Sequence, residues 1–240
     1  MISPNEWWRK KAKNLLMLMM TFRPKLLERD QITEMLWPEL GPEEAHRDLK
    51  IAMSTLYKVL EPARKRNTPS AYIVRDGTQY GWRQESDYWL DTQEFEAKIE
   101  IGDEQFRRDP HRAVHYYLDA LKLYAGDLLQ DFPYEEWASE ERERLLSRYL
   151  TTAERAAQIL LEEDEYDQVV EVCSALLFRD RYWESAYRLK MIAYINLGQP
   201  ALALRTYLGC ELSLRQDLSV EPSPATKEIY QSLPFLEIDD

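Results

Sequence analysis

Glycine is rare in this chain, and no long apolar run occurs in it. Only 7 of the 240 residues are glycine, which favours helices over a β fold rich in turns. The apolar stretch from Leu15 to Met20 is much shorter than the roughly 20 residues that span a bilayer. It also lacks the small-residue cleavage site of a signal peptide. The sequence therefore predicts a mainly α-helical, cytoplasmic protein that does not enter a membrane.

Cysteine is equally scarce, since Cys173 and Cys210 are the two in the sequence. They are far apart in the chain, and each lies in an apolar stretch with helical spacing. Buried free cysteines behave as small apolar side chains, and disulfides are rare in the cytosol. We expect both cysteines to be reduced thiols in the core, with neither a disulfide nor a metal ion.

The sequence also lacks a recognisable catalytic constellation. It contains no glycine loop of the phosphate-binding type, and its 3 histidines are scattered. His111 and His115 would share one face of a helix, which permits a metal ion, but no cysteine or carboxylate motif accompanies them. The acidic run 162–165 is explained by a solvated helix end and turn. These observations predict a protein that is not an enzyme and that holds no cofactor or metal.

The two halves of the chain carry opposite charge. The formal net charge is −12, but residues 1–86 hold 15 Lys and Arg against 11 Asp and Glu, a net of +4. Residues 87–240 hold the other 16 basic residues against 32 acidic ones, a net of −16. Such asymmetry indicates two domains, 1–86 and 87–240, with different partners. The first can approach nucleic-acid phosphates, whereas the second repels them.

The pattern of the first domain predicts a winged helix-turn-helix. Apolar residues recur at helical spacing over three segments: 7–20, 31–36 and 42–61. Asp30 is the expected N-cap of the second helix. Asp76-Gly77 separates two β-rich runs within 71–82, which is a strong hairpin signal. Three helices and a hairpin form the layout in which the third helix enters the major groove of duplex DNA, with the hairpin as the wing.

The third helix and the wing carry the side chains that could contact DNA. Three residues of the third helix are spaced to face one groove and are candidates for base edges: Arg47, Lys50 and Ser54. Four cations at its end and in the next loop are candidates for phosphates: Lys58, Arg64, Lys65 and Arg66. The wing adds Arg75, Thr78 and Gln79. Each of these is equally compatible with an exposed polar residue that contacts nothing.

The second domain is predicted to be a tetratricopeptide-like α-solenoid. Helices are expected over 92–107, 110–125, 135–162, 166–178, 182–197, 200–215 and 223–232. Tyr166 and Pro200 each open a helix after a turn and are 34 residues apart, which is the tetratricopeptide period. At the same offset Cys173 aligns with Tyr207. Stacked helix pairs form a concave groove, and the net charge of this domain favours a basic peptide or a protein partner there.

The most specific motif lies between Leu123 and Tyr149. It reads Leu-Tyr-x-Gly-Asp-Leu-Leu-x-Asp at its start and continues with Trp137 and with Arg-Glu-Arg-Leu from Arg142. This order resembles the bacterial transcriptional activator domain of SARP-type activators. Residues of the first domain are spaced as in the DNA-binding half of the same family: Leu36-Trp37-Pro38, Leu60-Glu61-Pro62, Tyr72-Ile73 and Tyr80.

The resemblance implies a bacterial transcription activator that binds double-stranded DNA through its winged helix. It implies that the helical repeats serve homodimer formation, signal input, or contact with RNA polymerase or another regulatory protein. Such proteins usually begin with a small β-sheet, whereas this chain starts at the first helix. Either the sheet is dispensable here or the chain is the C-terminal part of a larger regulator, and of the two we expect the second. Two other interpretations stay open: a module that binds only proteins, and a sensor whose groove holds a small ligand.

Overall fold

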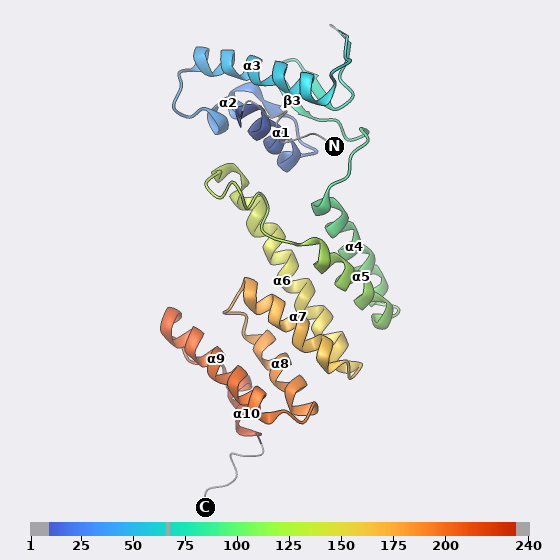
Figure 1. Cartoon of the computed structure of the whole chain (residues 1–240), viewed down its shortest axis with the longest axis vertical. Helices are drawn as coiled ribbons and strands as arrows, with labels where there is room; N and C mark the ends of the chain where they lie inside the picture. Colours follow the sequence, from blue (N-terminus) through green and yellow to red (C-terminus); the bar gives the residue numbers. More distant parts are fainter. Residues whose placement is uncertain (1–9, 66–67, 234–240) are drawn as a thin grey trace, which may run out of the picture. The chain divides into compact units, whose positions relative to one another are not determined.

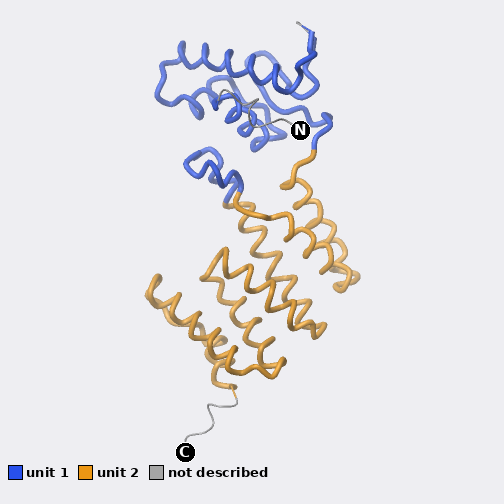
Figure 2. Tube along the Cα trace, in the orientation of Figure 1, with its two compact units in different colours: residues 1–88, 128–142 blue, residues 89–127, 143–240 orange. Residues whose placement is uncertain are grey.

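The computed structural model describes residues 10–65 and 68–233. They form a mainly helical fold, as predicted, with a three-stranded sheet (Figure 1). The chain divides into two compact units (Figure 2): unit 1 contains residues 1–88 and 128–142, and unit 2 contains residues 89–127 and 143–240. Within the described ranges, none of the helices is long and apolar enough to cross a membrane.

Unit 1 is a winged helix-turn-helix, which confirms the predicted three helices and hairpin. Its helices are α1 (Lys10–Phe22), α2 (Arg29–Leu36) and α3 (Pro42–Leu60). Its strands are β1 (Leu27–Glu28), β2 (Ile73–Asp76) and β3 (Gln79–Trp82), in the antiparallel order β1-β3-β2. The sequence does not reveal β1, because a strand of two residues is too short to show an alternating pattern.

The start of α2 corrects one prediction. The N-cap is Glu28 and not Asp30, which lies inside the first turn of the helix. The backbone N–H of Glu28 donates to the side-chain oxygen of Gln31 at 3.0 Å, and the two residues form a capping box. Asp is the more common N-cap residue, so the sequence alone favours the wrong position. Strand β1 sets the position of the N-cap, because it pairs Glu28 with Gln79 of the wing.

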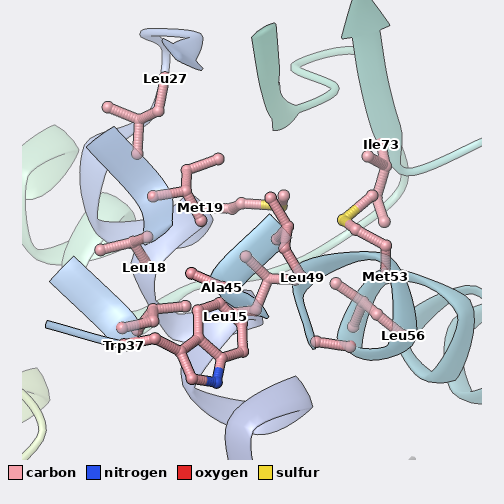
Figure 3. Close-up of a cluster of buried hydrophobic side chains, with 13 residues drawn as sticks. Leu15, Leu18, Met19, Leu27, Trp37, Ala45, Leu49, Met53, Leu56 and Ile73 are labelled. Carbon is pink, nitrogen blue, oxygen red and sulfur yellow. The ribbon is translucent and has the colours of Figure 1, made fainter. Parts of the chain in front are cut away.

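The helices and the sheet of unit 1 enclose one apolar core (Figure 3). α3 turns its predicted apolar face toward this core through Ala45, Leu49, Ala52, Met53 and Leu56, all of them buried. The other elements contribute buried residues as well: Leu15, Leu18 and Met19 from α1, Ile32 and Leu36 from α2, and Ile73 from β2. Because one face of α3 is held in this core, its opposite face is presented to solvent.

The segment 128–142 also belongs to unit 1, although it is distant in sequence. Trp137 of the short helix η2 (Glu136–Ala138) packs against the apolar core. The carboxylate of Glu135 accepts a hydrogen bond from Asn14 Nδ2 at 2.8 Å and another from Trp137 Nε1 at 2.7 Å. The bond from Asn14 ties the segment to α1, and the bond from Trp137 orients the Glu135 carboxylate within the segment.

Arg142 holds the loop of the same segment. Its Nε donates to the carbonyl of Leu128 at 3.0 Å, and its Nη2 donates to the carbonyl of Phe132 at 3.3 Å. A planar guanidinium can serve two carbonyls at once, which a lysine ammonium on a single stem does less well. Trp137 and Arg142, which make the segment distinctive in the sequence, are thus the residues that set its path.

Unit 2 consists of helix pairs of the tetratricopeptide kind. The helices are α4 (Asp91–Phe106), α5 (Pro110–Leu123), α6 (Ser139–Glu162), α7 (Tyr166–Arg179), α8 (Glu184–Asn196), α9 (Pro200–Leu218) and α10 (Pro224–Gln231). The first residues of α6 are assigned to unit 1. Each helix predicted for this part of the chain is present, and the one predicted over 135–162 consists of η2 followed by α6.

The predicted 34-residue repeat is visible in the backbone. Tyr166 and Pro200 are the first residues of α7 and α9. The turns before them match, because Asp164 and Gly198 both have left-handed φ angles, +60° and +69°. Buried positions repeat at the same offset in three pairs: Val169 and Ala203, Cys173 and Tyr207, and Leu176 and Cys210. The same local geometry therefore buries the same helix face in both repeats.

The variant Leu56→Ala tests whether this core holds α3. Leu56 has 0% of its surface exposed, and removal of such a side chain lowers the free energy of unfolding by about 2–5 kcal/mol. We expect a loss of that size in urea unfolding followed by circular dichroism. Ile51→Ala is the matched control on the same helix, because Ile51 is 39% exposed, and should change stability by at most ~0.5 kcal/mol. Equal losses would contradict this core.

The two cysteines provide a second test. Both are free and buried, as predicted. Burial raises the pKa of the Cys173 and Cys210 thiols to about 12, because a thiolate is poorly solvated in the core. The thiolate is the reactive form, so the folded protein should not react with Ellman's reagent at neutral pH. Both thiols should react after unfolding in guanidinium. Rapid reaction of either thiol in the folded chain would exclude this burial.

Candidate nucleic-acid interface

The outer face of α3 carries the residues predicted to contact base edges. Lys50 and Ser54 are exposed, and the side chain of Arg47 is 68% exposed. Lys58 is exposed one turn further along the helix. Residues spaced by three or four positions lie on one side of a helix, so these four side chains share the face opposite the core.

A cavity of about 320 Å³ lies between α3 and the wing. Lys50 and Ser54 line it from α3, and Arg75 and Thr78 line it from the wing. The tertiary structure therefore brings candidates from two separate segments to one concave surface. The other lining residues were not predicted as site residues, and Arg29, His46 and Tyr57 are among them. Helical spacing from Lys50 could have identified His46 and Tyr57, whereas Arg29 follows the unpredicted strand β1.

A small charge network lies at the edge of this cavity. Nε2 of His46 is 2.8 Å from Oδ1 of Asp30, and Arg29 Nε donates to the same oxygen at 3.1 Å. The hydrogen bond from Arg29, followed by that from His46, holds the pKa of Asp30 below its usual value. The carboxylate is thus ionised at neutral pH and offsets part of the positive charge at this edge.

Glu28 of β1 forms hydrogen bonds with the wing. Its carboxylate accepts hydrogen bonds from Thr78 Oγ1 and from Gln79 Nε2, each at 2.8 Å. The backbone N–H of Arg29 donates to the carbonyl of Thr78 at 3.0 Å. The side-chain donors of two predicted DNA-contacting residues are therefore engaged within the protein. Arg75 is exposed, and its guanidinium lies over the Tyr80 ring at 5.5 Å.

The loop after α3 contains the remaining candidates. Arg64 is partly buried, with its guanidinium 4.4 Å from the Tyr57 ring centroid, and it donates to the carbonyl of Thr68. Lys65 is exposed. Neither Arg64 nor Lys65 is among the described residues that line the cavity. Arg66 lies outside the described residues.

The histidines of α5 do not gather a set of metal ligands. His111 Nδ1 is 2.8 Å from Oε1 of Glu163, and the rings of His111 and His115 are 5.6 Å apart. Across residues 10–65 and 68–233 there is no group of three or more His, Cys, Asp or Glu side chains that could hold a metal ion.

The chain matches known proteins over most of its length. The family profile named bacterial transcriptional activator domain matches residues 90–233. The regulatory protein AfsR of Streptomyces coelicolor is 27% identical over 203 residues, which are 85% of this chain and 20% of AfsR. The transcriptional regulatory protein MoaR1 of Mycobacterium bovis is 24% identical over 238 residues, which cover 96% of this chain and 74% of MoaR1. The chain thus spans about one fifth of the length of AfsR.

A solved structure shares the fold. The structure of Mycobacterium tuberculosis EmbR in complex with a low-affinity phosphopeptide matches with a TM-score of 0.77 and 20% identity. The match covers 96% of this chain and 60% of EmbR. The winged helix and the helical repeats are therefore a known combination of folds.

The variant Glu28→Ala tests how the wing is held. It removes the acceptor for Thr78 and Gln79, and each lost hydrogen bond should cost about 0.5–1.5 kcal/mol. We expect faster hydrogen–deuterium exchange at the backbone amides of 77–80, measured by mass spectrometry. Glu34→Ala is the control, because Glu34 is an exposed residue of α2. Unchanged exchange in Glu28→Ala would show that β1 does not secure the wing.

Proposed function

This chain belongs to the bacterial transcriptional activator domain family, and we propose that it is a transcription activator that binds double-stranded DNA through unit 1. The observation that carries the proposal is the exposed polar face of α3 beside the wing. An α-helix fits the major groove of B-DNA, and in a winged helix-turn-helix the third helix occupies it. The relatives are named as regulatory proteins, which supports this role.

In this proposal some side chains of α3 contact bases, and others of α3, the loop and the wing contact phosphates. Arg47 and Lys50 face base edges, where Arg and Lys pair with the acceptors of guanine, and Ser54 adds a small polar contact. Four further cations contact phosphates, which position the protein without reading sequence: Lys58, Lys65, Arg66 and Arg75. Thr78, Gln79 and Arg64 act chiefly by holding the wing and the loop, since their side chains are engaged within the protein.

The two halves of the chain then serve different partners. We propose that residues 1–86 form the DNA-binding domain, with the segment 128–142 supporting its core. Residues 87–240 form the helical-repeat domain, which contacts RNA polymerase or another regulatory protein and supports a homodimer. In this role the protein acts in the cytoplasm and has no enzymatic activity.

DNA binding is tested by fluorescence anisotropy with a labelled pool of random duplexes. We expect binding that weakens steeply as salt is raised, because Lys and Arg displace condensed counterions from the phosphates. The double variant Arg47→Ala with Lys50→Ala should lose about 1–3 kcal/mol per base contact. Arg112→Ala, at an exposed position of α5, removes the same charge from unit 2 and should bind like the unmodified chain.

Selection of the tightest duplexes from the pool would then give the operator sequence. Failure of the chain to bind any duplex at low salt would overturn the proposal in favour of a module that binds only proteins. Equal weakening by Arg112→Ala would place the DNA on another surface.

A further inference from the structure

Unit 2 contains a groove of about 600 Å³ among α7, α8 and α9. Large apolar and aromatic residues line it: Leu177, Phe178, Tyr187, Tyr194 and Leu202. Phe178 is 85% exposed. Exposed apolar patches that are rimmed by polar residues mark binding surfaces, so this groove has the composition of a site that another molecule covers.

Two cations also line the groove, Lys190 from α8 and Arg205 from α9. Other cations of the same helices are paired, as Arg188 is with Glu184 at 3.8 Å and Arg215 with Glu211 at 3.2 Å. Within the described part of the chain, neither Lys190 nor Arg205 forms an ion pair, and no Asp or Glu lines the groove. The groove is thus locally basic in a half of the chain with a net charge of −16.

Lys190 is the less solvated of the two cations. It is partly buried, and its ammonium lies 5.9 Å from the centroid of the Tyr194 ring. Burial lowers its pKa, because desolvation disfavours the charged form. A partly buried cation without a carboxylate is stabilised when an anion enters the site. An anionic ligand therefore gains more here than at a solvated surface lysine.

A helical glycine lines the groove. Gly209 lies inside α9 and lines the groove, although glycine in a helix interior is destabilising relative to alanine. A Cβ at this position would meet no atom closer than 3.9 Å, a carbon of the Tyr187 ring. Packing within unit 2 therefore does not require glycine at this position of the groove wall.

We propose that this groove binds an extended peptide segment of a partner protein in which carboxylate side chains alternate with aromatic or aliphatic ones. The carboxylates pair with Lys190 and Arg205, and the apolar side chains pack on Phe178 and its neighbours. A nucleic acid is disfavoured because its continuous phosphate charge would be repelled by the net charge of −16 on residues 87–240. Lys190 and Arg205 thus favour an acidic ligand, whereas the net charge of −16 on residues 87–240 alone suggests a basic one. This site does not depend on DNA binding by unit 1.

Peptide binding is measured by fluorescence anisotropy of the full chain with three fluorescein-labelled probes. The first probe alternates Phe and Asp, the second alternates Phe and Lys, and the third alternates Ser and Asp. We expect saturable binding of the first probe alone, because it supplies both the charge and the apolar surface. Equal binding of the second or the third probe would overturn the proposal. So would equally tight binding of free phenylpropionate, which would indicate a small-molecule site.

Two variants locate the site. Arg205→Glu changes an exposed residue and should weaken the Phe and Asp probe by about tenfold or more, as expected for the loss of one charge-assisted contact. Arg112→Glu makes the same charge change at an exposed position of α5 and should bind normally. Lys190→Gln should also weaken the probe. Equal affinities for Arg205→Glu and Arg112→Glu would place the peptide elsewhere.

Circular dichroism and DNA binding of Arg205→Glu provide the remaining controls. Both should match the unmodified chain, because Arg205 lies in unit 2 and makes no ion pair within the described residues. Loss of peptide binding with DNA binding retained would establish two independent sites. A loss of helical content in Arg205→Glu would mean that this residue supports the fold instead, which would contradict its role in binding.

Discussion

The hydrogen bond from Asn14 to the Glu135 carboxylate joins parts of the chain that are 121 residues apart. It helps to hold the segment 128–142 in unit 1, where Trp137 packs on the same apolar core that holds α3. The winged helix-turn-helix is thus completed by residues from the middle of the activator-domain motif. This arrangement gives a physical reason for the motif, since its tryptophan packs on the core and Arg142 holds the loop.

The surface proposed to bind DNA depends on the same core. Burial of one side of α3 leaves Arg47, Lys50 and Ser54 on the other, and the bonds from Thr78 and Gln79 to Glu28 set the wing beside them. The net charge of residues 1–86 is only +4, but cations placed together on one face act locally. Because the bonds to Glu28 hold the wing in place before binding, less conformational entropy would be lost when DNA binds.

The helical repeats show how an average charge can conceal a local one. The half of the chain from residue 87 carries a net charge of −16, yet Lys190 and Arg205 line a groove without a carboxylate. The repeat geometry explains this separation, because successive helices turn one face toward the groove and another toward the stack. Residues four positions apart in sequence, such as Arg188 and Glu184, form ion pairs along a helix. Lys190 and Arg205, on the groove face, are available to a ligand.

The sequence by itself determined the helices, the hairpin around Gly77 and the 34-residue repeat, since periodicity and turn chemistry are encoded within a few neighbouring residues. It also identified Arg47, Lys50 and Ser54 as one helical face. Only the tertiary structure decided that Glu28 caps α2 and fastens the wing, that 128–142 completes unit 1, and that the groove is locally basic. The wing contacts of Glu28 and the packing of 128–142 join residues far apart in the chain, and the groove combines residues from three helices, so local sequence patterns do not predict them.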